Sequence, residues 1–229
     1  DVKLSSTSES QPTFTAPSLN VGDSALTLVL KVEVTDTQGA TATDTVTITV
    51  NAPANNDPSA NAGADQSVAT AATVTLDASA SADADPGDSI VSYAWTQSSG
   101  TDVKLSSTSE SQPTFTAPSL NVGDSALTLV LQVEVTDTQG ATATDTVTIT
   151  VNAPANNAPS ASAGADQSVA AAASVTLDAS ASADTDPGDS IASYAWTQSS
   201  GTAVTLSSTS ASQPTFTAPS LNVGDSALT

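Results

Sequence analysis

The chain of 229 residues contains no cysteine, no histidine and no methionine, and only three of its residues are basic. Without cysteine it can form neither a disulfide nor a thiolate metal site, and it has no thiol nucleophile. Without histidine it lacks the usual protein ligand of zinc and copper and the commonest general base. These absences exclude the cysteine- and histidine-dependent classes of enzyme and metalloprotein.

The charge is almost entirely of one sign. Twenty-four acidic residues stand against Lys3, Lys31 and Lys104, which gives a net charge of −21. Nucleic-acid phosphates and anionic membrane surfaces would be repelled, so we expect no nucleic-acid partner, and small divalent cations are the natural counter-charge. The longest apolar run, near Leu28–Leu30, is far too short for a bilayer span, so no membrane insertion is expected in this segment.

An internal repeat of 101 residues dominates the chain. Residues 1–27 recur at 102–128 and return, with substitutions, at 203–229. Residues 1–128 and 102–229 differ at ten positions, among them Lys31/Gln132 and Asp57/Ala158. A period of this length is too long for one coil of a solenoid, and it suits a β-sandwich that closes its own core.

Two short polar segments divide the chain. They read NAPANND at 51–57 and NAPANNA at 152–158, and their proline and asparagine content is typical of linkers. We therefore predict that residues 1–50 form the C-terminal half of one module, 58–151 a complete module, and 159–229 the N-terminal part of the next.

Apolar and polar residues alternate within 58–151, which is the pattern of strands with one buried and one wet face. Short strands are predicted around Val74 and Phe115, and around Val91, Tyr93 and Trp95, which we expect to share one face. The longest inward stripes are Leu127, Leu129, Leu131, Val133 and Val135, followed by Val147, Ile149 and Val151. Helical periodicity is nearly absent. The predicted fold is all-β, with tandem Ig-like antiparallel β-sandwich modules.

The order of these pieces resembles the polycystic kidney disease (PKD) domain family and its bacterial Ig-like relatives. The matching segments are PSANAGADQSV (58–68), VTLDASASADADPGDSIVSYAWTQSSG (74–100), PTFTAP (113–118) and LQVEVTDTQGATATDTVTITV (131–151). One departure is Pro86, which precedes Gly87 where the family often has glycine directly after its DxD pair. The resemblance implies a spacer or adhesive stalk, extracellular or on the cell surface.

The segment Asp83-Ala84-Asp85-Pro86-Gly87-Asp88 is the densest acidic cluster in the complete module. Calcium prefers six to eight oxygen ligands, and alternate aspartates in a turn can present two carboxylates to one ion. In an Ig-like sandwich this loop lies at the same end as the loop carrying Asp137 and the linker that carries Asp57. We therefore hypothesise a calcium site formed by Asp83, Asp85 and Asp137, with Asp57 or Asp88.

The next copy offers Asp184, Asp186 and Asp189, with Ala158 in place of the linker aspartate, so weaker binding is expected there. The alternative interpretation is that aspartate, proline and glycine are simply good turn residues and that the loop is a solvated acidic surface. General acid–base catalysis by these carboxylates is disfavoured, because they lie in a Ser/Ala-rich turn without a predicted cleft. We expect no enzyme.

Tyr93 and Trp95 have two interpretations. They could form a platform for stacking on sugars, but they alternate with small residues in a predicted central strand, which favours a place in the core.

Three functions follow from these patterns. The favoured one is a repetitive extracellular stalk of a large adhesin-like protein, with calcium at the module junctions. The second is a self-assembling surface filament, in which the strands of one chain complete the half module of another. The third is an accessory ligand-binding module beside a secreted hydrolase, which an exposed Trp95 would favour.

Overall fold

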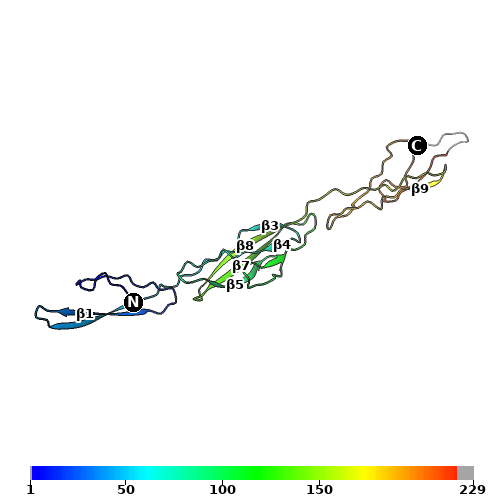
Figure 1. The fold of residues 1–229 in the computed structure, drawn as a ribbon. Helices are drawn as coiled ribbons and strands as arrows, with labels where there is room; N and C mark the ends of the chain where they lie inside the picture. Colours follow the sequence, from blue (N-terminus) through cyan, green and yellow to red (C-terminus); the bar gives the residue numbers. More distant parts are fainter. Residues whose placement is uncertain (1, 221–229) are drawn as a thin grey trace. The chain divides into compact units, whose positions relative to one another are not determined.

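The computed structural model describes residues 2–220, which divide into two compact units (Figure 1). The first unit comprises Asp1–Val68, Ala72–Pro118 and Leu127–Val151, and the second Ala69–Ala71, Ser119–Ala126 and Asn152–Thr229. The described residues form ten strands and no helix, so the prediction of an all-β chain is confirmed. In the same residues nothing has the length and apolarity of a membrane-spanning helix.

Six strands form what we call the central sandwich. Its two sheets have the strand orders β3-β8-β7-β5 and β4-β6. Strand β7 is antiparallel to both β5 and β8, and β4 is antiparallel to β6, as predicted. The strands are β3 (Gln66–Ala69), β4 (Thr73–Thr75), β5 (Ile90–Ser99), β6 (Thr114–Thr116), β7 (Leu127–Asp137) and β8 (Thr142–Asn152).

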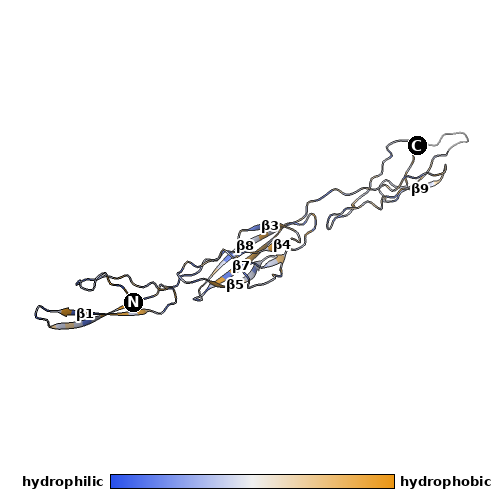
Figure 2. Cartoon of the chain, in the orientation of Figure 1, coloured by the Kyte–Doolittle hydropathy of each residue, from blue (hydrophilic) through white to orange (hydrophobic). Residues whose placement is uncertain are grey.

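The core of the central sandwich comes from the alternating stripes of β7 and β8. Hydrophobic and hydrophilic residues alternate along these strands (Figure 2). The fully buried side chains include Leu129, Leu131, Val133, Val135, Val147, Ile149 and Val151, together with Val74 and Leu76. Trp95 is only 2% exposed, and its indole Nε1–H donates to the carbonyl of Glu110 at 3.0 Å. The interpretation of Trp95 as core is thus confirmed, and it cannot stack on a sugar.

Val91 departs from the prediction. It is 59% exposed and does not share the face of Trp95. The pairing of β5 with β7 shifts in register between Ile90 and Ser92, which is the mark of a β-bulge. Because the bulge adds one residue to one strand, it breaks the alternation there and turns Val91 outward.

A second strand pair repeats almost the same sequence in a different environment. Strands β1 (Leu26–Thr35) and β2 (Thr41–Val50) pair antiparallel, in the register that β7 and β8 also use. Yet Val32 and Val46 are 55% and 52% exposed, whereas Val133 and Val147 have 0% exposure. Within residues 2–220, no sheet covers the apolar face of the β1–β2 hairpin.

The second unit contains a short sheet of β9 (Ser174–Thr176) and β10 (Thr215–Thr217), which corresponds to β4 and β6. Residues 191–200 repeat the sequence of β5 with one substitution, but they form no strand. Within residues 2–220, no strand lies beside them as β7 lies beside β5. A strand needs a neighbour to bond its backbone groups.

Candidate metal centre

The acidic loop of the central sandwich spans residues 83–88, between β4 and β5, and we call it the acid loop. Asp83 Oδ1 accepts the backbone N–H of Asp85 at 2.7 Å, and the N–H of Asp88 donates to the carbonyl of Asp85 at 3.1 Å. Gly87 has a φ of +81°, which glycine adopts without strain. Short-range bonds thus close the loop into a tight turn with three carboxylates.

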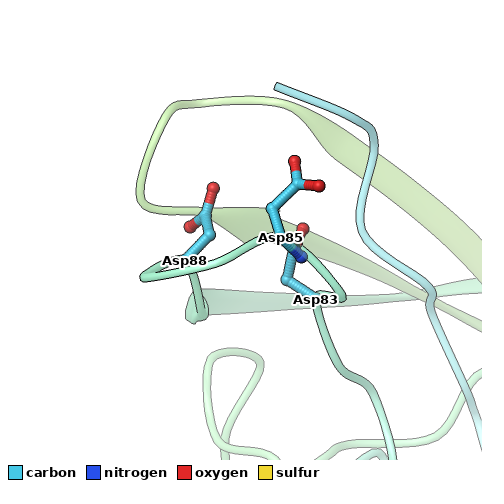
Figure 3. Close-up of side chains that lie close together, drawn as sticks. All are labelled: Asp83, Asp85 and Asp88. Carbon is cyan, nitrogen blue, oxygen red and sulfur yellow. Dashed lines mark hydrogen bonds between the residues drawn. The ribbon is translucent and has the colours of Figure 1, made fainter. Parts of the chain in front are cut away.

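These three carboxylates gather at one point (Figure 3). One oxygen from each of Asp83, Asp85 and Asp88 lies within 4.8 Å of the other two, and all three residues are half-buried. Asp83 Oδ2 and Asp88 Oδ2 are buried and have no hydrogen-bond partner. Carboxylates this close repel one another, and buried oxygens without partners are costly, so a bound cation would stabilise the loop. A single calcium ion, with oxygens at about 2.3–2.6 Å, fits this spacing.

Asp88 is positioned by the turn between β7 and β8. Its Oδ1 accepts the backbone N–H of Thr138 at 3.0 Å and also the Thr138 hydroxyl. The arrangement of the acid loop therefore depends on the presence of that turn.

The second unit repeats the three aspartates in a different arrangement. Asp184, Asp186 and Asp189 do not gather into a three-carboxylate group, and Asp189 is exposed.

Asp137 lies outside the gathered group, although the sequence suggested it as a ligand. Its side chain is 1% exposed, with Oδ1 accepting the N–H groups of Gln139 and Ala141, both at 2.8 Å. Oδ2 accepts Nδ2–H of Asn55 at 3.0 Å. Burial acts to raise the pKa of Asp137, but these donors and the N–H of Gly140 together outweigh it and lower the pKa. Asp137 thus fixes the β7–β8 turn and holds the linker.

This lowered pKa predicts an acid-dependent loss of stability. A carboxyl whose folded pKa lies below its unfolded value of about 4 stabilises the fold above that pH, and this contribution is lost as the pH falls through the folded pKa. We expect the melting temperature in chelator to fall more steeply below about pH 4 for the parent than for Asp137→Asn. Thermal scans between pH 2 and 7 measure this. The exposed Asp102→Asn is the control and should follow the parent.

Asp57 is exposed and also lies outside the gathered group. The linker is instead bound by its neighbour Asn56, whose backbone N–H donates to Asp85 Oδ2 at 2.7 Å while Nδ2 donates to Oδ1 at 2.8 Å. In the second unit Asn157 binds Asp186 in the same way, at 2.5 and 2.8 Å. The Asp57/Ala158 difference therefore leaves this contact intact.

A second segment reaches the acid loop within the first unit. The N–H of Val21 donates to the carbonyl of Pro86 at 3.1 Å, and Val21 is buried. The repeat of this contact lies in the second unit, where Val122 donates to the carbonyl of Pro187 at 3.0 Å. The acid loop is thus the place where the linker and an earlier segment of chain meet.

Asn55 and Asn157 were not expected to bind a carboxylate, and Asn56 was expected only to lie near the acid loop. Their signal was present, because both linkers carry the same Asn-Asn pair. An asparagine in a linker is usually a turn residue, and only the fold shows which carboxylate it meets.

Comparison with known proteins gives the family. The family model described as "K319L-like, PKD domain" matches residues 62–151 and 163–225. No curated protein matches the chain.

Several solved structures are similar to this chain, with low sequence identities and low TM-scores. The PKD domain from the KIAA 1837 protein is 25% identical, with 46% of this chain and 97% of that chain covered and a TM-score of 0.37. A nucleoside hydrolase-related hypothetical protein from Saccharophagus degradans is 26% identical; the match covers 43% of this chain and 26% of that chain, with a TM-score of 0.34. The protocadherin fragment PcdhgB3 EC1-4 is 16% identical; the match covers 91% of this chain and 51% of that chain, with a TM-score of 0.40. The resemblance noted in the sequence is confirmed by the family match: the chain belongs to the K319L-like PKD domain family.

Proposed function

We propose that this chain is a non-catalytic part of an extracellular stalk, built from sandwich modules in series and stiffened by calcium where one module joins the next. The modules are those expected at 1–50, 58–151 and 159–229, with linkers at 51–57 and 152–158. The observation that carries the proposal is the acid loop, whose buried oxygens lack partners and whose Asp85 binds the linker.

A stalk needs units that fold locally and a chain that stays extended. The central sandwich buries its stripes within itself, so its stability does not depend on distant parts of the chain. A net charge of −21 favours solubility and extension through self-repulsion. The buried Trp95 removes the motivation for a sugar-binding module.

Calcium is the cation that this donor set favours. The acid loop offers hard carboxylate oxygens, and the chain has neither histidine nor cysteine to favour a softer metal. Asp83 and Asp88 would bind the ion through their unpartnered oxygens, and Asp85 would add a third carboxylate while it holds Asn56. A bound ion would cancel the repulsion among them and so fix the loop that the linker contacts.

We expect calcium to raise the melting temperature of the central sandwich. Extracellular modules that bind calcium do so with dissociation constants of about 10⁻⁴–10⁻³ M. When the calcium concentration is ten times the dissociation constant, the folded state gains roughly 1.4 kcal/mol. For a domain of this size, this gain raises the melting temperature by about 5–10 °C. Calorimetry of the chain in chelator and in millimolar calcium measures the shift.

Two matched variants locate the ion. Asp88→Asn keeps an oxygen for Thr138 but removes the charge, and it should abolish most of the calcium-dependent shift. Asp189→Asn changes the same residue of the repeat where the carboxylates are not gathered, and it should leave the shift of the central sandwich unchanged. An identical melting temperature with and without calcium would remove calcium from the proposal.

A further inference from the structure

A tight turn of four residues, Asn20-Val21-Gly22-Asp23, precedes strand β1, and we call it the docking turn. The N–H of Asp23 donates to the carbonyl of Asn20 at 3.2 Å, and Asp23 Oδ2 accepts the N–H of Asn20 at 2.7 Å. Gly22 has a φ of +83°, which the third position of a type II turn requires. The turn is thus closed by its own bonds, and these do not use the N–H of Val21.

Val21 is instead bound outside the turn. Its N–H donates to the carbonyl of Pro86 in the acid loop at 3.1 Å, and the residue is only 6% exposed. Turns normally lie at the surface, so the burial of Val21 comes from what the turn packs against. Val21 is therefore the apolar anchor of a contact between the docking turn and the central sandwich.

Two glycines mark how closely the surfaces meet. A Cβ added at Gly87 of the acid loop would lie 2.5 Å from Asn20 Cγ. A Cβ added at Gly22 would lie 2.6 Å from Nε2 of Gln139, in the turn between β7 and β8. The docking turn therefore contacts two loops of the central sandwich, with no room for a side chain at either glycine.

The repeat of the docking turn at 121–124 makes the same contact within the second unit. Val122 donates to the carbonyl of Pro187 at 3.0 Å, and a Cβ at Gly188 would lie 2.6 Å from Asn121 Cγ. This contact forms although the three aspartates of that loop do not gather. The contact therefore does not depend on the carboxylate arrangement that calcium binding would need.

We propose that the docking turn fixes the orientation of residues 1–50 relative to the central sandwich, and that it does so without calcium. The division of the chain into modules at 51–57 is taken from the proposed function. Relative motion is the default for domains joined by a linker. Asn56 attaches the linker to the acid loop, and Val21 adds a second attachment from a separate segment of chain. Two attachments restrict rotation about the linker where one would not.

The docking contact and the candidate metal centre share a loop but use different atoms. Val21 bonds to the backbone carbonyl of Pro86, whereas the ion would bind to carboxylate oxygens. Removal of calcium should therefore leave the docking turn in place.

Amide exchange of the 229-residue chain in chelator, followed by NMR, tests the proposal. The measured quantity is the protection factor, the ratio of the intrinsic exchange rate to the observed one. The N–H of Val21 should be protected, and Val21→Asp should lower the protection of residue 21 by about 10- to 100-fold, because a charge replaces a buried apolar side chain. Ser24→Asp adds the same charge at an exposed neighbour and should leave Val21 protected. Val122→Asp, the same substitution in the repeat, should also leave it protected.

A second amide separates loss of docking from loss of the turn. The N–H of Asp23 bonds within the turn, so its protection should persist in Val21→Asp. Val21→Ala is a milder variant that keeps the turn and should lower the protection of residue 21 about tenfold. Nuclear Overhauser contacts between Asn20 and Gly87 should appear in the parent and in Ser24→Asp, but not in Val21→Asp.

Three results would overturn the proposal. They are a Val21 N–H that exchanges freely in chelator, a docking contact that appears only when calcium is added, and equal protection of residue 21 in Val21→Asp and Ser24→Asp. None of these results bears on whether calcium raises the melting temperature of the central sandwich. Conversely, a melting temperature that ignores calcium would leave the docking contact intact, so the two proposals fail separately.

Discussion

Replacing Leu131 by alanine is expected to lower the free energy of unfolding of the central sandwich by about 2–5 kcal/mol. Leu131 is fully buried in β7, where it pairs with Gln97 of β5 and Val147 of β8. Truncation removes apolar contacts from both neighbours and leaves a cavity that surrounding strands cannot easily close. Since a domain of this size is stable by only about 5–15 kcal/mol, the variant loses a large part of its stability. Denaturant titration measures the change.

The repeat supplies a control with the same local sequence. Leu30 is the equivalent residue in the β1–β2 hairpin, where it is only half-buried. Leu30→Ala should leave the unfolding of the central sandwich unchanged when the chain is dilute. If both variants lowered the free energy of unfolding of the central sandwich equally, Leu131 would not have the special place in the core that its burial indicates.

Replacing Gly100 by alanine is expected to cost about 2–5 kcal/mol, from backbone strain and overpacking together. Gly100 follows β5 with a φ of +97°, a conformation that residues with a Cβ rarely adopt. A Cβ there would lie 2.5 Å from the carbonyl oxygen of Thr128 and 2.7 Å from Leu129 Cδ2. Both belong to β7, so relief of the clash would disturb the main stripe of the core.

Gly140 separates the two causes. Its φ is +91°, but a Cβ there would have no atom within 4 Å. Gly140→Ala should therefore cost only the strain, about 1–2 kcal/mol. Thermal unfolding of both variants checks the difference, and a cost for Gly140→Ala as large as that for Gly100→Ala would contradict the packing part of the argument.

The strands of the central sandwich were predictable because alternation records burial directly. Leu129, Leu131 and Val133 each point inward, as a period of two requires. Val91 was not predictable, because a β-bulge is a feature of pairing between strands. Nothing in IVSYAW states where the register against β7 shifts.

The candidate metal centre was predictable only where its residues are close in sequence. Asp83, Asp85 and Asp88 share one turn, so their spacing brings them together. Asp137 lies far along the chain, and its oxygens are taken by the N–H groups of its own turn and by Asn55. A sequence shows that a carboxylate is present, but it does not show which hydrogen-bond donors lie beside that carboxylate in the folded chain.

The repeat sets a further limit on prediction. Residues 26–50 and 127–151 have nearly the same sequence and the same strand pairing, but one apolar face is buried and the other is open. Burial here is decided by the rest of the sandwich. Local sequence therefore predicts the strand pairing of both hairpins correctly, but it does not predict which of the two has a buried apolar face.

Nearly the same hairpin sequence is buried at 127–151 and has an exposed apolar face at 26–50. Amide hydrogen exchange on the dilute chain, in chelator, measures this most directly, because peptides with Lys31 and with Gln132 can be told apart by charge. Protection in β7 and β8 should approach that of global unfolding, and β1 and β2 should exchange through local opening, orders of magnitude faster. Equal protection of the two hairpins in the monomeric chain would contradict this difference in burial.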